Sequence, residues 1–161
     1  MKRIPMELRL VRQTDDAPPC PYRMIRTSDR IDLAILLYAA FRGTIDDEGE
    51  RFADALAEID KTYAGGYGGL LLDCSFVCEK DEFLVSACLI GRSVPDGVPW
   101  IVFSMTRPEA QRQGLARFLL GRSINALLDR GYARLQLIVT AGNTPAQQLY
   151  ASLGFRPLDG F

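Results

Sequence analysis

The sequence contains no histidine among its 161 residues. Histidine is the usual partner of serine and cysteine nucleophiles and the commonest general base near neutral pH, so Ser-His and Cys-His catalysis are excluded. The four cysteines include no C-x-x-C pair, which together with the missing histidine argues against a zinc site. We therefore expect no metal, buried free thiols, and acid–base chemistry carried by carboxylates, tyrosine, lysine, cysteine or water.

The sequence also lacks an excess of charge and any long apolar run. Its 19 basic and 20 acidic residues give a net charge of −1, which argues against nucleic acid or an anionic membrane as the main partner. No apolar run approaches the roughly 20 residues that cross a membrane, and residues 1–7 lack the apolar core of a signal peptide. We expect a cytoplasmic protein with a single domain, 1–161, in which residues 1–21 form an N-terminal extension.

The spacing of apolar residues predicts an α/β fold with a mixed, mostly antiparallel central sheet flanked by helices, in the order β-α-α-β-β-β-α-β-α-β. After a short strand in the extension at 7–13, strands are expected at 22–26, 70–78, 83–90, 100–106, 133–140 and from 155 onward. Helices are expected at 31–41, 50–63, 115–130 and 145–153, the last with Thr144 as its N-cap.

The stretch Gln111–Ala116 lies between the strand expected at 100–106 and a helix pattern that begins at Leu115. The first N–H groups of a helix have no partner within the helix, and the helix dipole favours an anion there. Gly114 has no Cβ, so a ligand can approach the backbone closely, and Arg112 and Arg117 flank the turn. The stretch is typical of a phosphate-binding turn, although a glycine before a helix also occurs in ordinary turns.

Two motifs in the last third of the chain occur in order, with room between them for one helix and one strand. The first is Gln111-x-x-Gly114-x-Ala116, and the second is Asn143-x-x-Ala146-x-x-Leu149-Tyr150-x-x-Leu153-Gly154-Phe155. They resemble the pyrophosphate loop and the second motif of the GNAT N-acetyltransferase superfamily. The resemblance extends over nearly the whole chain, but only this last third is specific.

The resemblance implies transfer of an acetyl group from acetyl-CoA to a primary amine of a small molecule or peptide. The cofactor's pantetheine arm would pair with backbone groups of Met105 and Thr106, and Tyr150 would be the catalytic residue near the thioester sulfur. The other cofactor-binding residues that the resemblance implies are Gln111, Arg112, Gln113, Gly114, Leu115, Ala116 and Asn143. The resemblance is also compatible with a homodimer, and with a second subunit or the N-terminal segment completing the short C-terminal edge of the sheet.

The chemistry requires a free amine. An amine with a pKa near 10.4 is mostly protonated at pH 7, and deprotonating it costs roughly 4–5 kcal/mol. A carboxylate could take the proton, but the strand 100–105 contains none. Water relayed by Ser104 or by the backbone remains open, as do the carboxylates of Glu79, Asp73, Asp46 and Asp47.

Tyr150 and the acidic segment 46–50 each have a structural interpretation as well. Tyr150 shares an apolar stripe with Ala146 and Leu153, as a core aromatic would; at an ordinary pKa it would help the leaving thiolate mainly as a hydrogen-bond donor. Acidic residues at 46–50 could bind a cationic amine, or could simply favour the start of the second helix. A non-catalytic acyl-CoA sensor is the alternative function. A nucleotide site is disfavoured, because no Lys-Ser/Thr follows Gly114 and no G-x-G-x-x-G is present.

Overall fold

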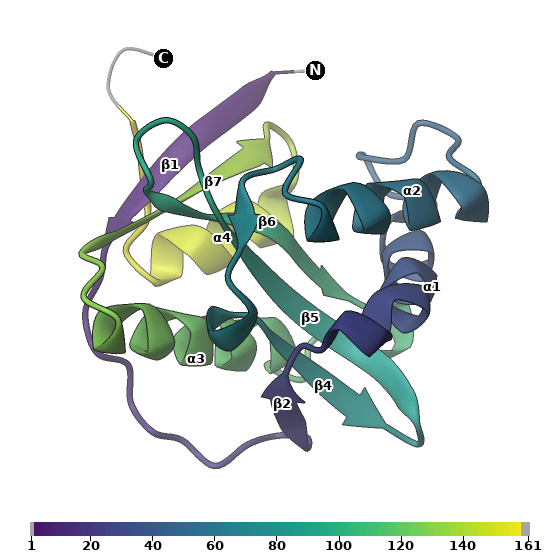
Figure 1. The fold of residues 1–161 in the computed structure, drawn as a ribbon, viewed down its shortest axis with the longest axis horizontal. Coiled ribbons are helices and arrows are strands. Elements are labelled where there is room, and N and C mark those ends of the chain that lie inside the picture. Colours follow the sequence, from purple (N-terminus) through teal and green to yellow (C-terminus); the bar gives the residue numbers. More distant parts are fainter. Residues whose placement is uncertain (1, 159–161) are drawn as a thin grey trace.

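The computed structural model describes residues 2–158, so residues 1 and 159–161 of the expected domain lie outside the described residues. One sheet runs through the molecule in the order β2-β4-β5-β6-β7-β1-β8, with β3 paired to β5 (Figure 1). The strands are β1 Arg3–Arg9, β2 Tyr22–Met24, β3 Gly69–Leu70, β4 Phe76–Lys80, β5 Phe83–Arg92, β6 Pro99–Thr106, β7 Arg134–Thr140 and β8 Arg156–Pro157. The helices are α1 Arg30–Phe41, α2 Phe52–Tyr63, α3 Leu115–Asp129 and α4 Thr144–Ser152.

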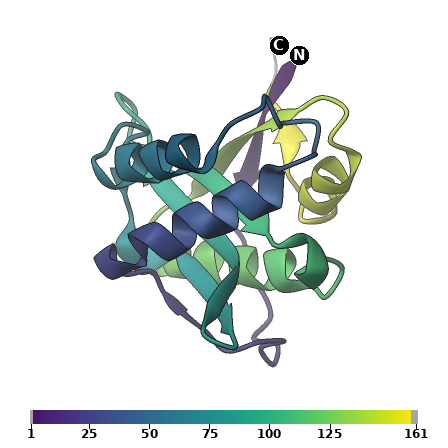
Figure 2. The same cartoon turned by 90° about the vertical axis from the view of Figure 1, so that its right-hand side faces the viewer.

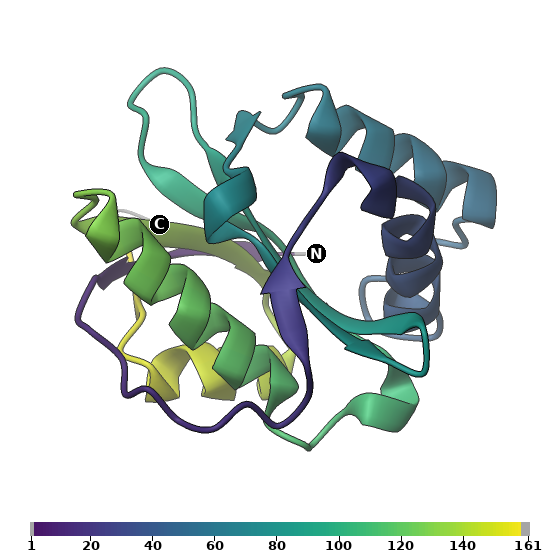
Figure 3. The same ribbon diagram turned by 60° about the horizontal axis from the view of Figure 1, so that its bottom comes forward.

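The helices lie on both faces of the sheet. α1 and α2 cover one face (Figure 2), and α3 and α4 cover the other (Figure 3). Residues 84–91 of β5 are therefore all buried, as expected for a strand covered on both sides. Leu33, Leu36 and Ile59 fill the first core, and Leu120 and Ile124 belong to the second. The mixed, mostly antiparallel architecture predicted from the sequence is confirmed.

The N-terminal segment forms part of the sheet. β1 pairs antiparallel with β7 from Arg3↔Thr140 to Arg9↔Arg134, and its other edge pairs with β8. The strand begins and ends four residues earlier than the predicted range of 7–13, because residues after Arg9 leave the sheet and run along α3 (Figure 3). There the Gln13 N–H donates to the Asn125 side chain at 2.8 Å. The N-terminal segment thus pairs with the short C-terminal strand, for which the sequence left open this segment or a second subunit.

Two local expectations were wrong. The apolar run 70–78 is not one strand: a 3₁₀ turn at Leu72–Cys74 separates β3 from β4, and the buried Ser75 hydroxyl accepts the Ile90 N–H there at 2.9 Å. The N-cap of α4 is Asn143, not Thr144, and its side chain accepts the Ala146 N–H at 3.4 Å. Apolar content alone cannot locate a 3₁₀ turn, and asparagine caps a helix at least as well as threonine.

None of the helices in the part of the chain that the structure describes is long and apolar enough to cross a membrane.

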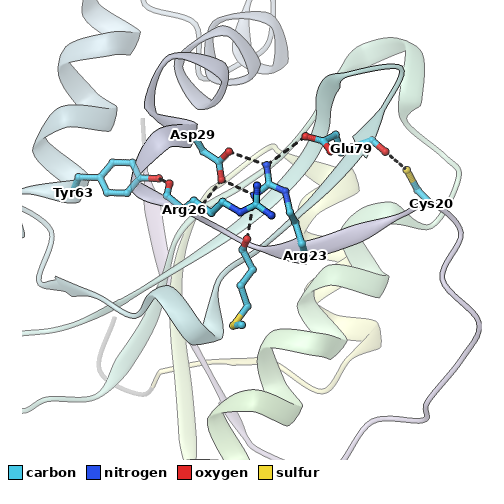
Figure 4. A network of polar contacts seen from close by, with 7 residues as sticks. Cys20, Arg23, Arg26, Asp29, Tyr63 and Glu79 are labelled. Atoms are coloured by element: carbon cyan, nitrogen blue, oxygen red, sulfur yellow. Dashed lines mark hydrogen bonds and ion pairs between the residues drawn. The ribbon is translucent and has the colours of Figure 1, made fainter.

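A buried ion pair fixes the start of α1 against the sheet. Asp29 is 4% exposed and accepts two hydrogen bonds from the Arg23 guanidinium and one from the Arg26 N–H, each at 2.8 Å (Figure 4). Arg23 also contacts Glu79 of β4 at 3.3 Å, and the Tyr63 hydroxyl donates to the Arg26 carbonyl at 2.6 Å. Burial would raise the pKa of the Asp29 carboxyl, but the hydrogen bonds from Arg23 and Arg26 outweigh it and hold that pKa below its usual range.

This pair makes stability depend on pH through Asp29. A carboxyl whose folded pKa is lowered stabilises the fold above its unfolded pKa of about 3.9, and the contribution is lost as pH falls through the folded pKa. Asp29→Asn should lower the free energy of unfolding by about 3 kcal/mol at pH 7, because the half-buried Arg23 guanidinium loses its two-bond carboxylate partner and its remaining ion pair is the longer contact to Glu79. Urea unfolding should show this difference shrinking below about pH 4. The exposed Asp32 on the same helix gives the control, and Asp32→Asn should change stability by less than about 0.5 kcal/mol. A difference for Asp29→Asn that is independent of pH would contradict the assignment.

Candidate active site

The site is created where β6 and β7 separate. The two strands are parallel neighbours, but within residues 2–158 they share one register pair, Trp100↔Gln136, near their starts. The register between β5 and β6 shifts there: Leu89 pairs with Phe103 and Ile90 with Ile101, which leaves Val102 as the extra residue of a bulge. A bulge bends its strand and breaks the regular pairing. The strands therefore diverge toward their C-terminal ends.

A cavity of about 720 Å³ fills this opening. Residues 101–104 of β6 and 137–140 of β7 form its sheet side, while α1, α2 and the connection between them form the opposite side. Asn143 and Tyr150 line it from α4 and the turn before that helix. The cavity therefore lies beside the C-terminal half of β7 and the middle of β6, where the two parallel strands have separated.

Tyr150 is both a core residue and a lining residue of this cavity. It is 8% exposed and packs edge-on against Phe155 with 5.6 Å between ring centroids. Burial raises the pKa of the Tyr150 phenol to about 12; the nearby Cys88 adds to the rise, and the Ser104 side chain opposes it. Transfer of its proton to a thiolate of pKa about 8.5 would then be uphill by roughly 5 kcal/mol. The hydroxyl is suited to donate a hydrogen bond and not to release its proton.

The predicted phosphate-binding turn leads from β6 into α3. Gly114 is the N-cap of α3 with φ of 77°, and no atom lies within 4 Å of the position that a Cβ would occupy. The backbone N–H groups of residues 113–116 have no hydrogen-bond partner within residues 2–158. Gln111, Arg112 and Gln113 are exposed, Ala116 is half-buried, and Leu115 is buried at 3% exposure. A row of free donors thus borders open space at the positive end of a helix.

Met105 and Thr106 present their backbone in opposite directions. The Arg107 N–H donates to the Val85 carbonyl of β5 at 2.9 Å. Backbone groups alternate along an antiparallel pair, so those of Met105 also face β5, whereas those of Thr106 and Ser104 face the gap beside β7. The Met105 side chain lies in the core under α1 at 3% exposure. Thr106 is therefore the one of the two whose peptide groups can reach a molecule in the gap.

The cavity carries an excess of carboxylates on the side of α2 and the α1–α2 connection. Two arginines, Arg3 and Arg42, also line it. The carboxylates are those of Asp46, Asp47, Glu48, Glu50, Asp54 and Glu58. Glu79 and Asp73, which the sequence also offered as bases, lie outside the cavity lining. Glu79 contacts Arg23, and Asp73 accepts a hydrogen bond from Arg130 at 2.6 Å.

Several lining residues could not be found from the sequence. Arg3 reaches the cavity because β1 pairs with β7, a contact between segments far apart in the chain. Thr140 lines it and donates a hydrogen bond to Asp46 at 2.6 Å. Ile138 keeps 48% exposure there. The alternation of β7 indicated that Leu135, Leu137 and Val139 share one side, but nothing in it indicated that Ile138, on the other side, faces a cavity.

Most of the chain matches a known protein family. The family model described as the acetyltransferase (GNAT) family matches residues 27–155. The chain belongs to the GNAT acetyltransferase family. The match covers β4 to β7, the turn at Gly114, and α4 with Tyr150, so this GNAT chain carries its opening between β6 and β7 inside the matched region.

Relatives with curated descriptions are similar to parts of this GNAT chain. The ribosomal protein bS18 alanine N-acetyltransferase of Salmonella typhimurium is 34% identical over 106 residues, 66% of this chain and 69% of the relative. The protein of the same description from Escherichia coli K12 is 54% identical over 48 residues, so this chain spans 32% of that relative's length. A mycothiol acetyltransferase of Jonesia denitrificans is 46% identical over 50 residues, 31% of this chain and 16% of the relative.

Solved structures show the same fold at low identity. A GCN5-related N-acetyltransferase from Sphaerobacter thermophilus aligns with a TM-score of 0.68 and 20% identity, over 97% of this chain and 48% of that one. The ribosomal-protein-S18-alanine N-acetyltransferase of Escherichia coli aligns with a TM-score of 0.62 and 22% identity, over 83% of this chain and 76% of that one. These matches support the mixed sheet and its flanking helices.

Proposed function

We propose that this chain transfers the acetyl group of acetyl-CoA to a primary amine of a peptide or small molecule. The observation that carries the proposal is the arrangement along β6. One edge of this strand opens onto a cavity that Tyr150 lines, and its end leads into a turn of free N–H donors. A long ligand with an anionic middle and a reactive end fits such a path. Acetyl-CoA supplies an acyl group activated as a thioester.

The residues present fit that ligand. In the proposed complex the pyrophosphate accepts hydrogen bonds from the N–H groups of residues 113–116, at the positive end of α3. Gln111 and Arg112 flank the turn. The pantetheine arm lies in the gap beside β6, where the peptide groups of Thr106 and Ser104 face it; Met105 supports this strand from the core. Asn143 contacts the arm from the turn before α4.

The acceptor amine is proposed to enter from the side of the α1–α2 connection. The carboxylates there favour a positively charged group, and the amine nitrogen meets the thioester carbon between Ser104 and Tyr150. The relatives support an amine on a protein or a small molecule: one is described as acting on an alanine of a ribosomal protein. A structural neighbour is described in complex with a CoA–acetylneamine bisubstrate analogue.

Tyr150 is proposed to donate a hydrogen bond to the sulfur as negative charge develops on it. Because its pKa of about 12 lies far above that of a thiol, the phenol remains protonated throughout the working pH range. Its contribution is therefore electrostatic stabilisation of the departing thiolate.

Gly114→Ala tests the anion turn. The new methyl group would occupy the open space that the phosphate must enter, and alanine at a positive φ costs roughly 1–2 kcal/mol in stability. We expect calorimetry to show acetyl-CoA affinity reduced at least about tenfold. Gly131 at the other end of α3 has φ of 86° and equally open space. Gly131→Ala therefore carries the same backbone strain and should leave acetyl-CoA affinity unchanged. Equal affinity losses in both variants would mean that strain alone is responsible.

Tyr150→Phe tests the catalytic role and keeps the ring that packs on Phe155. We expect kcat to fall about a hundredfold in a thiol-release assay with an N-terminal alanine hexapeptide or neamine as acceptor. The wild type and the variant should have the same pH dependence between about pH 6 and 10, because a phenol of pKa about 12 does not titrate there. Acetyl-CoA binding without turnover of any acceptor would favour an acyl-CoA sensor. Binding of ATP in preference to acetyl-CoA would refute both functions.

A further inference from the structure

The α1–α2 connection is held against the sheet at the cavity by one short contact. Thr140, the last residue of β7, is 7% exposed, and its hydroxyl donates to Asp46 Oδ1 at 2.6 Å. The neighbouring Ile45 packs against the turn that follows β7, where a Cβ on Gly142 would lie 3.0 Å from the Ile45 Cδ1 atom. Asp46 itself is half-buried. This carboxylate therefore has a fixed position beside the end of β7, although it comes from a connection between helices.

The other carboxylates of the cavity differ from Asp46 in what they contact. Asp47 accepts the N–H groups of Gly43 and Gly49 at 2.7 and 2.8 Å. Three more carboxylates also accept hydrogen bonds from groups close to them in sequence. Glu50 accepts the Glu48 N–H, Asp54 the Arg51 N–H and Glu58 the Tyr67 hydroxyl. Glu48 is exposed. Asp46 is thus the lining carboxylate bound to a strand of the opening, and its Oδ2 has no hydrogen-bond partner within residues 2–158.

We propose that Asp46 is the general base of the reaction and that Thr140 positions it. The inference rests on the proposed function. The acceptor ammonium first loses one proton to solvent. The neutral amine nitrogen then attacks the thioester carbonyl carbon, and a C–N bond forms. The proton displaced from that nitrogen passes to Asp46 Oδ2, directly or through one water. The C–S bond then breaks, and its electron pair leaves with the sulfur, which accepts the Tyr150 hydrogen bond. Asp46 returns its proton to solvent through the open side of the cavity.

This assignment explains how the chain works without a carboxylate on β6 or a histidine anywhere. Attack makes the nitrogen far more acidic than the free ammonium, so a carboxylate can accept its proton at that stage. The charged and titratable groups that share the cavity with Asp46 are Arg3, Arg42, Asp47, Glu48, Glu50, Asp54, Glu58, Tyr38 and Tyr150. Their excess of negative charge favours a cationic acceptor. Such an acceptor loses one proton before the attack and a second one after it, and Asp46 accepts the second.

The decisive experiment is the pH dependence of kcat and KM for Asp46→Asn with the N-terminal alanine hexapeptide and with neamine. We expect kcat at pH 7 to fall about a hundredfold, with acetyl-CoA affinity unchanged by calorimetry. The activity of the variant should continue to rise up to about pH 9.5, because hydroxide replaces the missing base, while that of the wild type levels off. Glu48→Gln removes the same charge from the same cavity and should change KM but not kcat. Asp73→Asn, outside the cavity, should change neither.

Variants at Thr140 test the positioning role independently, and they keep the inference testable if Asp46→Asn does not fold. Thr140→Val removes the hydroxyl at nearly constant volume and should lower kcat about tenfold, whereas Thr140→Ser should restore it. A kcat for Asp46→Asn within threefold of the wild type, or equal losses in Asp46→Asn and Glu48→Gln, would overturn the inference while leaving the proposed function intact. If the wild type failed to bind acetyl-CoA, or to acetylate either probe, the proposed function itself would be wrong. The role of Asp46 would then be refuted with it.

Discussion

The separation of β6 from β7 is the constraint on which the site depends. Two parallel strands that paired along their whole length would leave no room between them. The bulge at Val102 and the single register pair at Trp100 and Gln136 replace that pairing with a gap. In the gap the backbone groups of Ser104 and Thr106 face β7 without the paired strand that a regular sheet would supply, and buried backbone groups need a ligand, a side chain or water as a partner. The same departure from regular structure that weakens the sheet therefore creates a surface prepared for an extended polar ligand.

Much of the fold could be predicted because its periodicities are local. The helical spacing in α2 and α3 and the alternation in β7 each depend on a single segment. The order of helices and strands followed from them. The two motifs that resemble those of the GNAT family also lie within single segments. Expectations that depended on local detail were less accurate. The 3₁₀ turn at Leu72–Cys74 and the cap at Asn143 each depend on one side-chain hydrogen bond. Neighbouring residues could form a similar bond, and the sequence does not show which one does.

The site was predictable only where one segment provides it. The turn at Gly114 and the tyrosine on α4 are each encoded within a short motif, so the sequence pointed to both. The contact between Asp46 and Thr140 joins a helix connection to the end of a strand. Nothing in the sequence of either segment predicts that the two meet. The sequence could name Asp46 as one of several carboxylates, but it could not rank them. The structure ranks them by what each one contacts, because most are engaged by backbone amides or by side chains outside the opening.

The place of β1 in the sheet has a consequence for how the chain folds. β1 pairs along its whole length with β7 and also separates β7 from β8. During synthesis this segment leaves the ribosome long before its partner strand exists, and contacts between segments so distant in sequence form slowly. Until then β1 is an unpaired strand with alternating apolar residues, the kind of segment that chaperones bind and that aggregates. An inner strand of the finished sheet is thus exposed to aggregation in the nascent chain.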